Sequence, residues 1–234
     1  FFKEKSSLNK LFPEAFLFNQ PKDLLTGDFY WFGHVNNHKI IAVADCTGHG
    51  VPGALLSILG HNALDAIVNT QGNTLPSKIL FELNQTILKA FSNQTQVEFG
   101  IDITIVSIKD GSNELLFSGI TNGLYHFSAD KINHHKVTSK TIGLTLSEKD
   151  LFDQSVSIKK GDCFYLLSDG YCDQFSGHSH KIEKYNLQQM DALLRGISIS
   201  NTFSKSDAAL SVDFNKWKGS REQTDDVLVL GFKI

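Results

Sequence analysis

The stretch IIAVADCTGHG, residues 40–50, passes directly from a run of apolar residues into an aspartate, Asp45, and then into closely spaced glycines. Three other aspartates stand at the same kind of junction between an apolar run and a turn: Asp28 in GDFYWF, Asp169 in CFYLLSDGY and Asp225 in QTDDVLVLGF. A single aspartate beside a glycine is usually a turn residue, because its side chain hydrogen-bonds to the local backbone. Four at strand ends require a further explanation.

If these strand ends meet in space, four carboxylates come together. Two carboxylates ~5 Å apart repel by about 3 kcal/mol at an effective dielectric constant of ~20. Divalent cations would remove this repulsion, and ligand sets made only of oxygen suit Mg²⁺ or Mn²⁺. Two such ions close together can activate a water molecule for attack on a phosphoester. The pattern therefore predicts a two-metal hydrolytic site.

The composition is that of an ordinary enzyme domain, with 234 residues, 41% hydrophobic and 20% charged, and a formal net charge of −3. This length fits one sizeable domain or two small ones. No internal repeat, low-complexity tract or linker rich in proline, glycine or serine divides the chain. We therefore expect one domain.

Several classes of protein are disfavoured. Among the 22 basic residues only Arg195 and Arg221 are arginines, and no long basic run occurs, which argues against a nucleic-acid partner. No apolar segment approaches the roughly 20 residues of a membrane span and no signal peptide opens the chain, so we expect no membrane span in this fragment. The chain begins at Phe1 rather than at a methionine, so an upstream sensor or membrane anchor could precede it.

The cysteines and histidines give no alternative site. Cys46, Cys163 and Cys172 are too few and too irregular for a disulfide framework, which favours a reduced, cytoplasmic setting. None is followed by the arginine that a cysteine-dependent phosphatase loop requires. The two close histidine pairs, His134–His135 and His178–His180, lie in polar stretches typical of loops, so neither is expected to bind a metal ion.

Short apolar runs bounded by polar turns predict eight strands. Several are joined by turns of hairpin length, such as Asn36-Asn37, which predicts antiparallel pairing. The predicted strands cover about residues 29–33, 38–45, 101–108, 114–119, 123–128, 155–158, 162–168 and 226–233.

Two pairs of helical patterns interrupt the strands. The first pair runs from Pro52 to about Val68 and from Thr74 through Phe91, and the second covers Leu187–Ile197 and Phe203–Trp217. Helices that are consecutive in sequence are expected to lie side by side on one sheet. The predicted fold is α+β, a four-layer α/β/β/α sandwich with two mainly antiparallel sheets flanked by helix pairs.

The glycines of residues 48–53, GHGVPG, satisfy the G-x-G-x-x-G pattern of dinucleotide-binding domains. Two features argue against that function: Asp45, Cys46 and Thr47 separate the apolar run from the first glycine, and a second helix follows where a parallel strand is required. We interpret the glycines as a place where the backbone approaches an ion, with a carbonyl oxygen after Asp45 as a ligand and helix N–H groups near a phosphate. His49 is interpreted as structural rather than as a general acid.

Five stretches, in this order, resemble the SpoIIE-like branch of the metal-dependent type-2C (PPM) serine/threonine protein phosphatases: PKDLLTGDFYWF, ADCTGHGVPGALLSILG, FGIDITIVSI, GDCFYLLSDGYCDQF and QTDDVLVLGFKI. The resemblance extends from about Leu11 to Ile234 and is specific because five motifs agree in order and spacing. It implies a PPM-type phosphatase domain over residues 21–234, with residues 1–20 as an N-terminal coupling segment of the same domain.

The resemblance implies a site with two Mn²⁺ or Mg²⁺ ions. Asp45 would bridge the ions, the Cys46 backbone carbonyl would add a ligand, and Asp169 and Asp225 would complete the shell. Asp28 matches the first acidic motif of the family and would act on one ion directly or through its waters. The four aspartates are the expected catalytic residues, since a hydroxide that bridges the metals would attack phosphorus without a protein nucleophile.

Two further carboxylates and one altered loop belong to the same comparison. Asp226 would contact the metal ligands rather than the ions themselves. Asp102, in FGIDI, is open to two interpretations: a contact to a third ion or to the substrate, or an ordinary polar strand residue. In SGITNGLYHF, Thr121 and Gly123 replace an asparagine and a proline of the family pattern. We expect this change to affect the loop and the approach of substrate rather than the metal shell.

The resemblance also implies partners. The SpoIIE-like branch removes phosphate from phosphoserine on anti-sigma-antagonist proteins in bacterial sigma-factor regulation, so such a phosphoprotein is the expected substrate and an upstream sensor the expected regulator. Residues 1–20 fit a coupling or homodimer helix, and equally a terminal helix that docks on the core. Two other functions stay open: a catalytically silent phosphatase fold that binds a partner, and a two-metal hydrolase of small phosphoesters.

Overall fold

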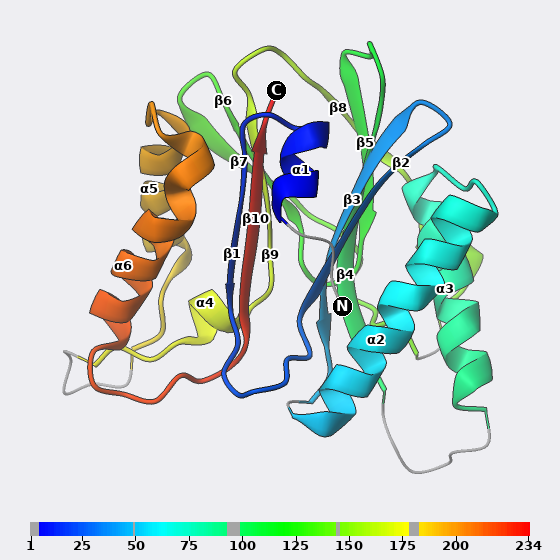
Figure 1. Ribbon diagram of the computed structural model, residues 1–234, viewed down its shortest axis with the longest axis horizontal. Coiled ribbons are helices and arrows are strands. Elements are labelled where there is room, and N and C mark those ends of the chain that lie inside the picture. Colours follow the sequence, from blue (N-terminus) through cyan, green and yellow to red (C-terminus); the bar gives the residue numbers. More distant parts are fainter. Residues whose placement is uncertain (1–4, 49, 93–98, 144–145, 178–182) are drawn as a thin grey trace.

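The computed structural model describes residues 5–234 except 49, 93–98, 144–145 and 178–182. Within this part, two five-stranded sheets lie face to face, and a pair of helices covers the outer side of each (Figure 1). The pairings between the strands are all antiparallel in the described residues. The predicted four-layer α/β/β/α sandwich is confirmed.

The first sheet has the order β2-β3-β4-β5-β8 and the second the order β1-β10-β9-β6-β7. All eight predicted strands are present, and each of their ends lies within two residues of the prediction. The strands are β1 Ala15–Gln20, β2 Phe29–Val35, β3 His38–Cys46, β4 Ile101–Lys109, β5 Glu114–Gly119, β6 Leu124–Ser128, β7 Lys131–His135, β8 Gln154–Ser157, β9 Cys163–Leu167 and β10 Val227–Lys233.

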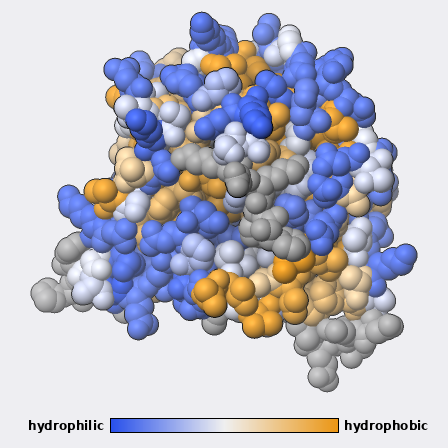
Figure 2. Space-filling model, in the orientation of Figure 1, coloured by the Kyte–Doolittle hydropathy of each residue, from blue (hydrophilic) through white to orange (hydrophobic). Residues whose placement is uncertain are grey.

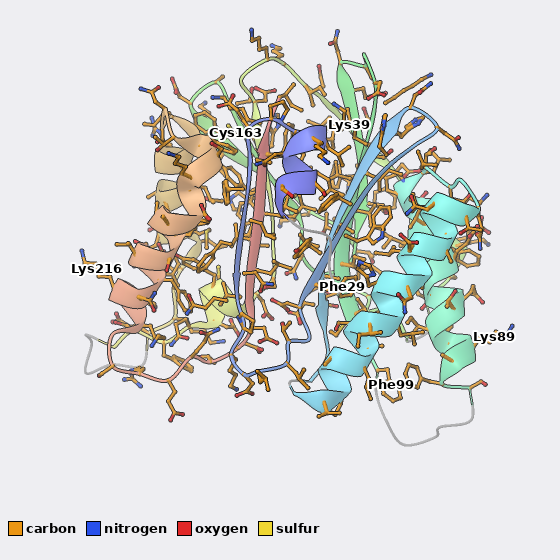
Figure 3. The ribbon with its side chains drawn as sticks, viewed as in Figure 1. Phe29, Lys39, Lys89, Phe99, Cys163 and Lys216 are labelled. Carbon is orange, nitrogen blue, oxygen red and sulfur yellow. The ribbon has the colours of Figure 1, made fainter. Side chains whose placement is uncertain are left out.

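Both predicted helix pairs are present, one on each sheet. Gly60 lets the first pair lie close to its sheet, since a Cβ at this position would come within 2.9 Å of the Phe29 ring of β2 (Figure 3). On the opposite side of the molecule, Lys216 projects outward from the second pair (Figure 3). The helices are α1 Lys5–Leu11, α2 Val51–Asp65, the π-helical turn η1 Ala66–Thr70, α3 Pro76–Ala90, η2 Glu148–Asp150, α4 Gly170–Asp173, α5 Leu187–Ser198, η3 Phe203–Lys205 and α6 Ser206–Lys218.

The continuous helix formed by α2 and η1 corrects one expectation. It has 20 residues with a mean hydropathy of 1.4, which is long and apolar enough to cross a membrane, so the prediction that no segment approaches this length is wrong. More than half of it is buried within the domain, and Leu56, Leu64 and Ile67 pack against the first sheet. A core helix and a membrane span meet the same criteria of length and composition, and the packing here is that of a core helix.

The N-terminal segment is built into the same domain. Leu8 of α1 and Phe12 are buried in the core between the two sheets, and β1 pairs with β10 along its whole length. Residues 15–20 therefore form a strand, which the sequence did not predict. A coupling role for residues 1–20 stays a prediction, and residues 1–4 lie outside the described part of the chain.

The side chains of β3 alternate between two cores. Ala42 and Ala44 pack toward the helices α2 and α3, whereas Ile41 and Val43 pack toward the second sheet. Because side chains of a strand alternate with a period of two, Asp45 points into the space between the sheets. The second sheet supplies aspartates at the same end of this space.

Candidate metal centre

Five aspartates from both sheets line one cavity of about 220 Å³. Asp45 of β3 lies directly opposite Asp102 of β4, Asp169 follows β9, and Asp225 and Asp226 precede β10. The other residues that line the cavity are Cys46, Thr47 and Gly48. The fold thus brings together every predicted site residue except Asp28, which is buried and does not line the cavity.

Asp28 is buried, with 2% of its surface exposed, and its Oδ2 atom has no hydrogen-bond partner among the described residues. The Ser168 hydroxyl hydrogen-bonds to the Asp28 carboxylate and accepts a hydrogen bond of 2.9 Å from the N–H of Leu228. Burial raises the pKa of Asp28 to about 8; the Ser168 hydrogen bond opposes this rise, and the nearby Asp226 and Asp169 carboxylates add to it. A buried carboxylate oxygen without a partner is costly unless a proton or a cation binds to it.

The carboxyl groups of Asp45 and Asp169 come from different sheets and line the same cavity. Burial raises the pKa of Asp45 to about 10, and the carboxylates of Asp28, Asp169 and Asp225 raise it as well. The pKa of Asp169 is also raised, first by burial and then by Asp173 and Asp225. Carboxyl groups in this situation either hold protons or need a cation to stay ionised.

Asp226 reaches the cavity wall, but both of its oxygens already accept hydrogen bonds from the backbone. Oδ1 accepts from the N–H of Lys22 and Oδ2 from the N–H of Gly27, each at 2.8 Å. These two bonds fix the loop between β1 and β2, which leads directly to Asp28. Asp226 therefore holds the segment that positions another carboxylate.

Two threonine hydroxyls hold Asp102. The Thr141 hydroxyl donates to Oδ1 at 3.1 Å, and the Thr121 hydroxyl hydrogen-bonds to the same carboxylate. Burial raises the pKa of Asp102, and the two hydrogen bonds oppose this rise. Thr121 has a φ of 61°, a left-handed conformation that is unusual for a β-branched residue. The altered loop thus contacts a carboxylate of the cavity.

Glycine brings the backbone close to the cavity at one point. A Cβ on Gly27 would lie 2.9 Å from the carbonyl oxygen of Cys46 and 3.0 Å from that of Gly48. Only glycine fits such an approach without displacing its neighbours, so the loop before Asp28 packs directly against the carbonyl that is predicted to bind metal. His49, which we interpret as structural, lies outside the described residues.

The cavity suits a hard cation. Its charged groups are carboxylates, and no lysine or arginine of the described residues lines it. Within the same residues, no three acidic, histidine or cysteine side chains converge tightly enough to enclose an ion by themselves. Mg²⁺ in proteins keeps several waters and is usually held by only one or two carboxylates, so an open cavity of this kind is compatible with it.

The paired histidines lie elsewhere. Nε2 of His134 is 2.7 Å from a carboxylate oxygen of Asp191, and His135 lines a separate cavity of about 300 Å³. His178 and His180 lie outside the described residues. The histidines with a described position therefore take no part in the carboxylate cavity.

Sequence reasoning missed Ser168, Thr121 and Thr141 as partners of the aspartates. Ser168 could have been found, because it directly precedes Asp169. Thr141 gave no such signal, since it lies 39 residues from its partner, Asp102.

The sequence model of the family described as Stage II sporulation protein E (SpoIIE) matches residues 36–234. The chain belongs to the SpoIIE family. This SpoIIE-family chain is 27% identical over 157 residues to the phosphoserine phosphatase RsbU of Bacillus subtilis (strain 168). The match covers 64% of the chain and 44% of RsbU, so the chain spans less than half the length of that relative.

Solved structures share the SpoIIE-family fold. The SiaA-PP2C domain of Pseudomonas aeruginosa matches with a TM-score of 0.87 and 27% identity, over 98% of this chain and 89% of that one. The PP2C phosphatase domain of SpoIIE from Bacillus subtilis, solved with a fragment of its regulatory domain, matches with a TM-score of 0.74 and 19% identity, over 94% and 63%. The chain is a SpoIIE-family domain with the PP2C fold, and the predicted family is confirmed.

Proposed function

We propose that this domain is a metal-dependent phosphoserine/phosphothreonine protein phosphatase that uses two Mn²⁺ or Mg²⁺ ions. The main support is the cavity in which aspartates of both sheets meet, with raised pKa values and without a cationic side chain on the described wall. RsbX, which shares the fold with a TM-score of 0.64 and 16% identity, was solved in complex with magnesium. This supports divalent metal use in the shared fold.

Asp45, Asp169 and Asp225 would hold the ions from the cavity wall, with the Cys46 carbonyl as a further oxygen donor. Asp28 would act on one ion directly or through its waters. When bound, the ions would lower the pKa of a water molecule and neutralise charge on the phosphoryl group. The residues of the chain would hold the oxygen donors in place, and none of them would act as a nucleophile.

Other residues fix this arrangement. Ser168 orients Asp28 by a hydrogen bond, and Asp226 holds the loop that leads to Asp28. Thr121 and Thr141 orient Asp102, which faces the cavity and would contact a third ion or the substrate.

The proposed substrate is phosphoserine on an anti-sigma-antagonist-like protein, in cytoplasmic bacterial signalling. The support is the match to RsbU, a phosphoserine phosphatase. We further propose that an upstream sensor region regulates the domain through residues 1–20, in a monomer or a homodimer. The burial of Leu8 and Phe12 between the sheets gives this segment direct contact with the core.

The test is phosphate release from an aryl phosphate and from a phosphoserine peptide, with Mn²⁺, Mg²⁺ or chelator, for the wild type and Asp169→Asn. We expect turnover that requires both metal and Asp169. Activity that persists in chelator, or in the purified Asp169→Asn variant, would contradict the proposed site.

Two other functions give different results in the same assay. A catalytically silent binding module would release no phosphate with any ion, and a hydrolase of small phosphoesters would prefer the aryl phosphate over a phosphoprotein. The presence of every matching carboxylate argues against the silent module, since a binding module has no need to keep them.

A further inference from the structure

Four exposed aliphatic side chains lie on two neighbouring segments of the domain. Leu24 and Leu25, in the loop between β1 and β2, are 98% and 44% exposed, and Val51 and Leu55, in the first turns of α2, are 60% and 63% exposed. We call these four residues the apolar lip. Figure 2 shows hydrophobic residues gathered along the lower edge of the molecule, where Figure 1 places this loop and the start of α2.

The two segments of the lip are in direct contact. The hydroxyl of Ser57, in α2, donates to the carbonyl of Thr26 at 3.4 Å as well as to a carbonyl of its own helix. A Cβ on Gly53, also in α2, would lie 3.3 Å from the Cα of Gly27. The loop and the helix therefore form one continuous surface.

This surface borders the carboxylate cavity. Thr47 and Gly48 line the cavity and lead into α2, and the carbonyl of Gly48 packs against Gly27 at the end of the loop. The two segments that form the lip are also those that lead to Asp28 and from Asp45. A phosphoserine with its phosphate in the cavity would thus bring the residues next to it over the lip.

We propose that the apolar lip binds aliphatic or aromatic residues that flank the phosphoserine of a protein substrate. This inference rests on the proposed phosphatase function and deepens it, because it states which sequence around the phosphoserine is preferred. Exposed aliphatic side chains lose contact with water when they are covered, and this favours an apolar partner over a charged one. A small phosphoester has no flanking residues and gains nothing from the lip.

The test compares three phosphoserine peptides with leucine, glycine or lysine on both sides of the phosphoserine, and an aryl phosphate as a substrate without flanks. The lip variant is the double substitution Leu24→Ser and Leu55→Ser. The matched control is Ile199→Ser with Val212→Ser, because these aliphatic residues are also exposed, at 63% and 70%, and lie in the layer of α5 and α6 on the other sheet.

We expect the wild type and the control to prefer the leucine peptide over the glycine peptide by about tenfold in kcat/KM. The lip variant should lose this preference and keep its turnover of aryl phosphate. Equal use of the leucine and glycine peptides by the wild type, a preference for the lysine peptide, or an unchanged preference in the lip variant would overturn the proposal. A change of oligomeric state in the lip variant, measured by sedimentation velocity, would assign the lip to a second copy of the chain instead.

The experiment distinguishes an error in the proposed role of the lip from an error in the proposed phosphatase function. If the wild type hydrolyses neither the aryl phosphate nor any of the phosphoserine peptides, the proposed function fails, and fluorescence anisotropy of the same peptides, labelled with a fluorophore, tests the lip without turnover. Tighter binding of the leucine peptide that is lost in the lip variant would support the lip, and equal binding of the three peptides would overturn it.

Discussion

Asp45 and Asp169 line the same cavity, although Asp45 belongs to β3 of one sheet and Asp169 follows β9 of the other. Burial and the nearby Asp169 carboxylate both raise the pKa of Asp45. The domain therefore joins its two sheets at a point that needs a proton or a cation. The same requirement that destabilises the end of the sandwich at high pH makes it a site for divalent ions.

The stability of the metal-free domain should fall as pH rises. Asp28 and Asp45 have pKa values of about 8 and about 10 in the folded state, above the ~3.9 of an unfolded aspartate. Between these values the folded state binds more protons than the unfolded state, so the free energy of unfolding decreases with increasing pH. Urea unfolding in chelator between about pH 5 and about pH 9 measures this fall.

Added Mn²⁺ is the control for that experiment. With Mn²⁺ present, the free energy of unfolding should decrease much less as the pH rises, because a cation replaces the protons at the carboxylates and binds only the folded state. A metal-free domain that is more stable at high pH than at low pH would show that these carboxyl groups are not protonated in the folded state.

The Asp45→Asn substitution should abolish phosphate release and leave the fold intact. An asparagine side chain is uncharged and removes the repulsion between Asp45 and the neighbouring carboxylates of Asp28, Asp169 and Asp225, so the metal-free variant should be more stable than the wild type by about 1–3 kcal/mol at alkaline pH. Denaturant unfolding in chelator measures the gain, and Mn²⁺ titration of the melting temperature should show a weaker stabilisation than in the wild type. An equal rise in melting temperature with Mn²⁺ in the two proteins would show that Asp45 does not bind the metal.

Most of the fold could be predicted because its signals are local. The apolar runs of β3 and β9 end sharply at polar turns, and both helix pairs have regular apolar spacing. Two strands escaped prediction for physical reasons. The six residues of β1, AFLFNQ, do not alternate, because their neighbours on both faces are core residues, and β7, KINHH, is a polar edge strand.

The site was predicted less completely, because the sequence shows which residues are acidic and not what holds them. The four aspartates at the strand ends were visible, and the sandwich places three of them around one cavity, together with Asp102 and Asp226. The hydrogen bonds from Ser168 to Asp28 and from Thr141 to Asp102 depend on contacts between segments distant in the chain. Such contacts have no periodic signature in a single sequence.

Removal of the Asp226 carboxylate should destabilise the domain. Asp226→Ala leaves the buried N–H of Gly27 without its partner and releases Lys22, for an expected loss of about 2–4 kcal/mol in the free energy of unfolding. Asp226→Asn is the matched control, because its amide oxygen can still accept one of the two hydrogen bonds, and its loss should be smaller. Equal stability of Asp226→Ala and the wild type in urea would show that the loop before Asp28 is held by other contacts.

Replacement of Thr121 by asparagine should stabilise the domain. Thr121 has a φ of 61°, and a β-branched side chain in this left-handed conformation costs on the order of 1 kcal/mol or more, whereas asparagine adopts it readily. The asparagine amide can also donate a hydrogen bond to Asp102, as the threonine hydroxyl does. We therefore expect the free energy of unfolding of Thr121→Asn to rise by about 1 kcal/mol, with phosphate release retained. Thr121→Val keeps the branched shape but cannot donate to Asp102, so it should gain no stability. Because Asp102 is then less well oriented, half-maximal turnover should require a higher Mn²⁺ concentration than in the wild type. If Thr121→Asn is less stable than the wild type in urea, the left-handed backbone at this position is not a source of strain.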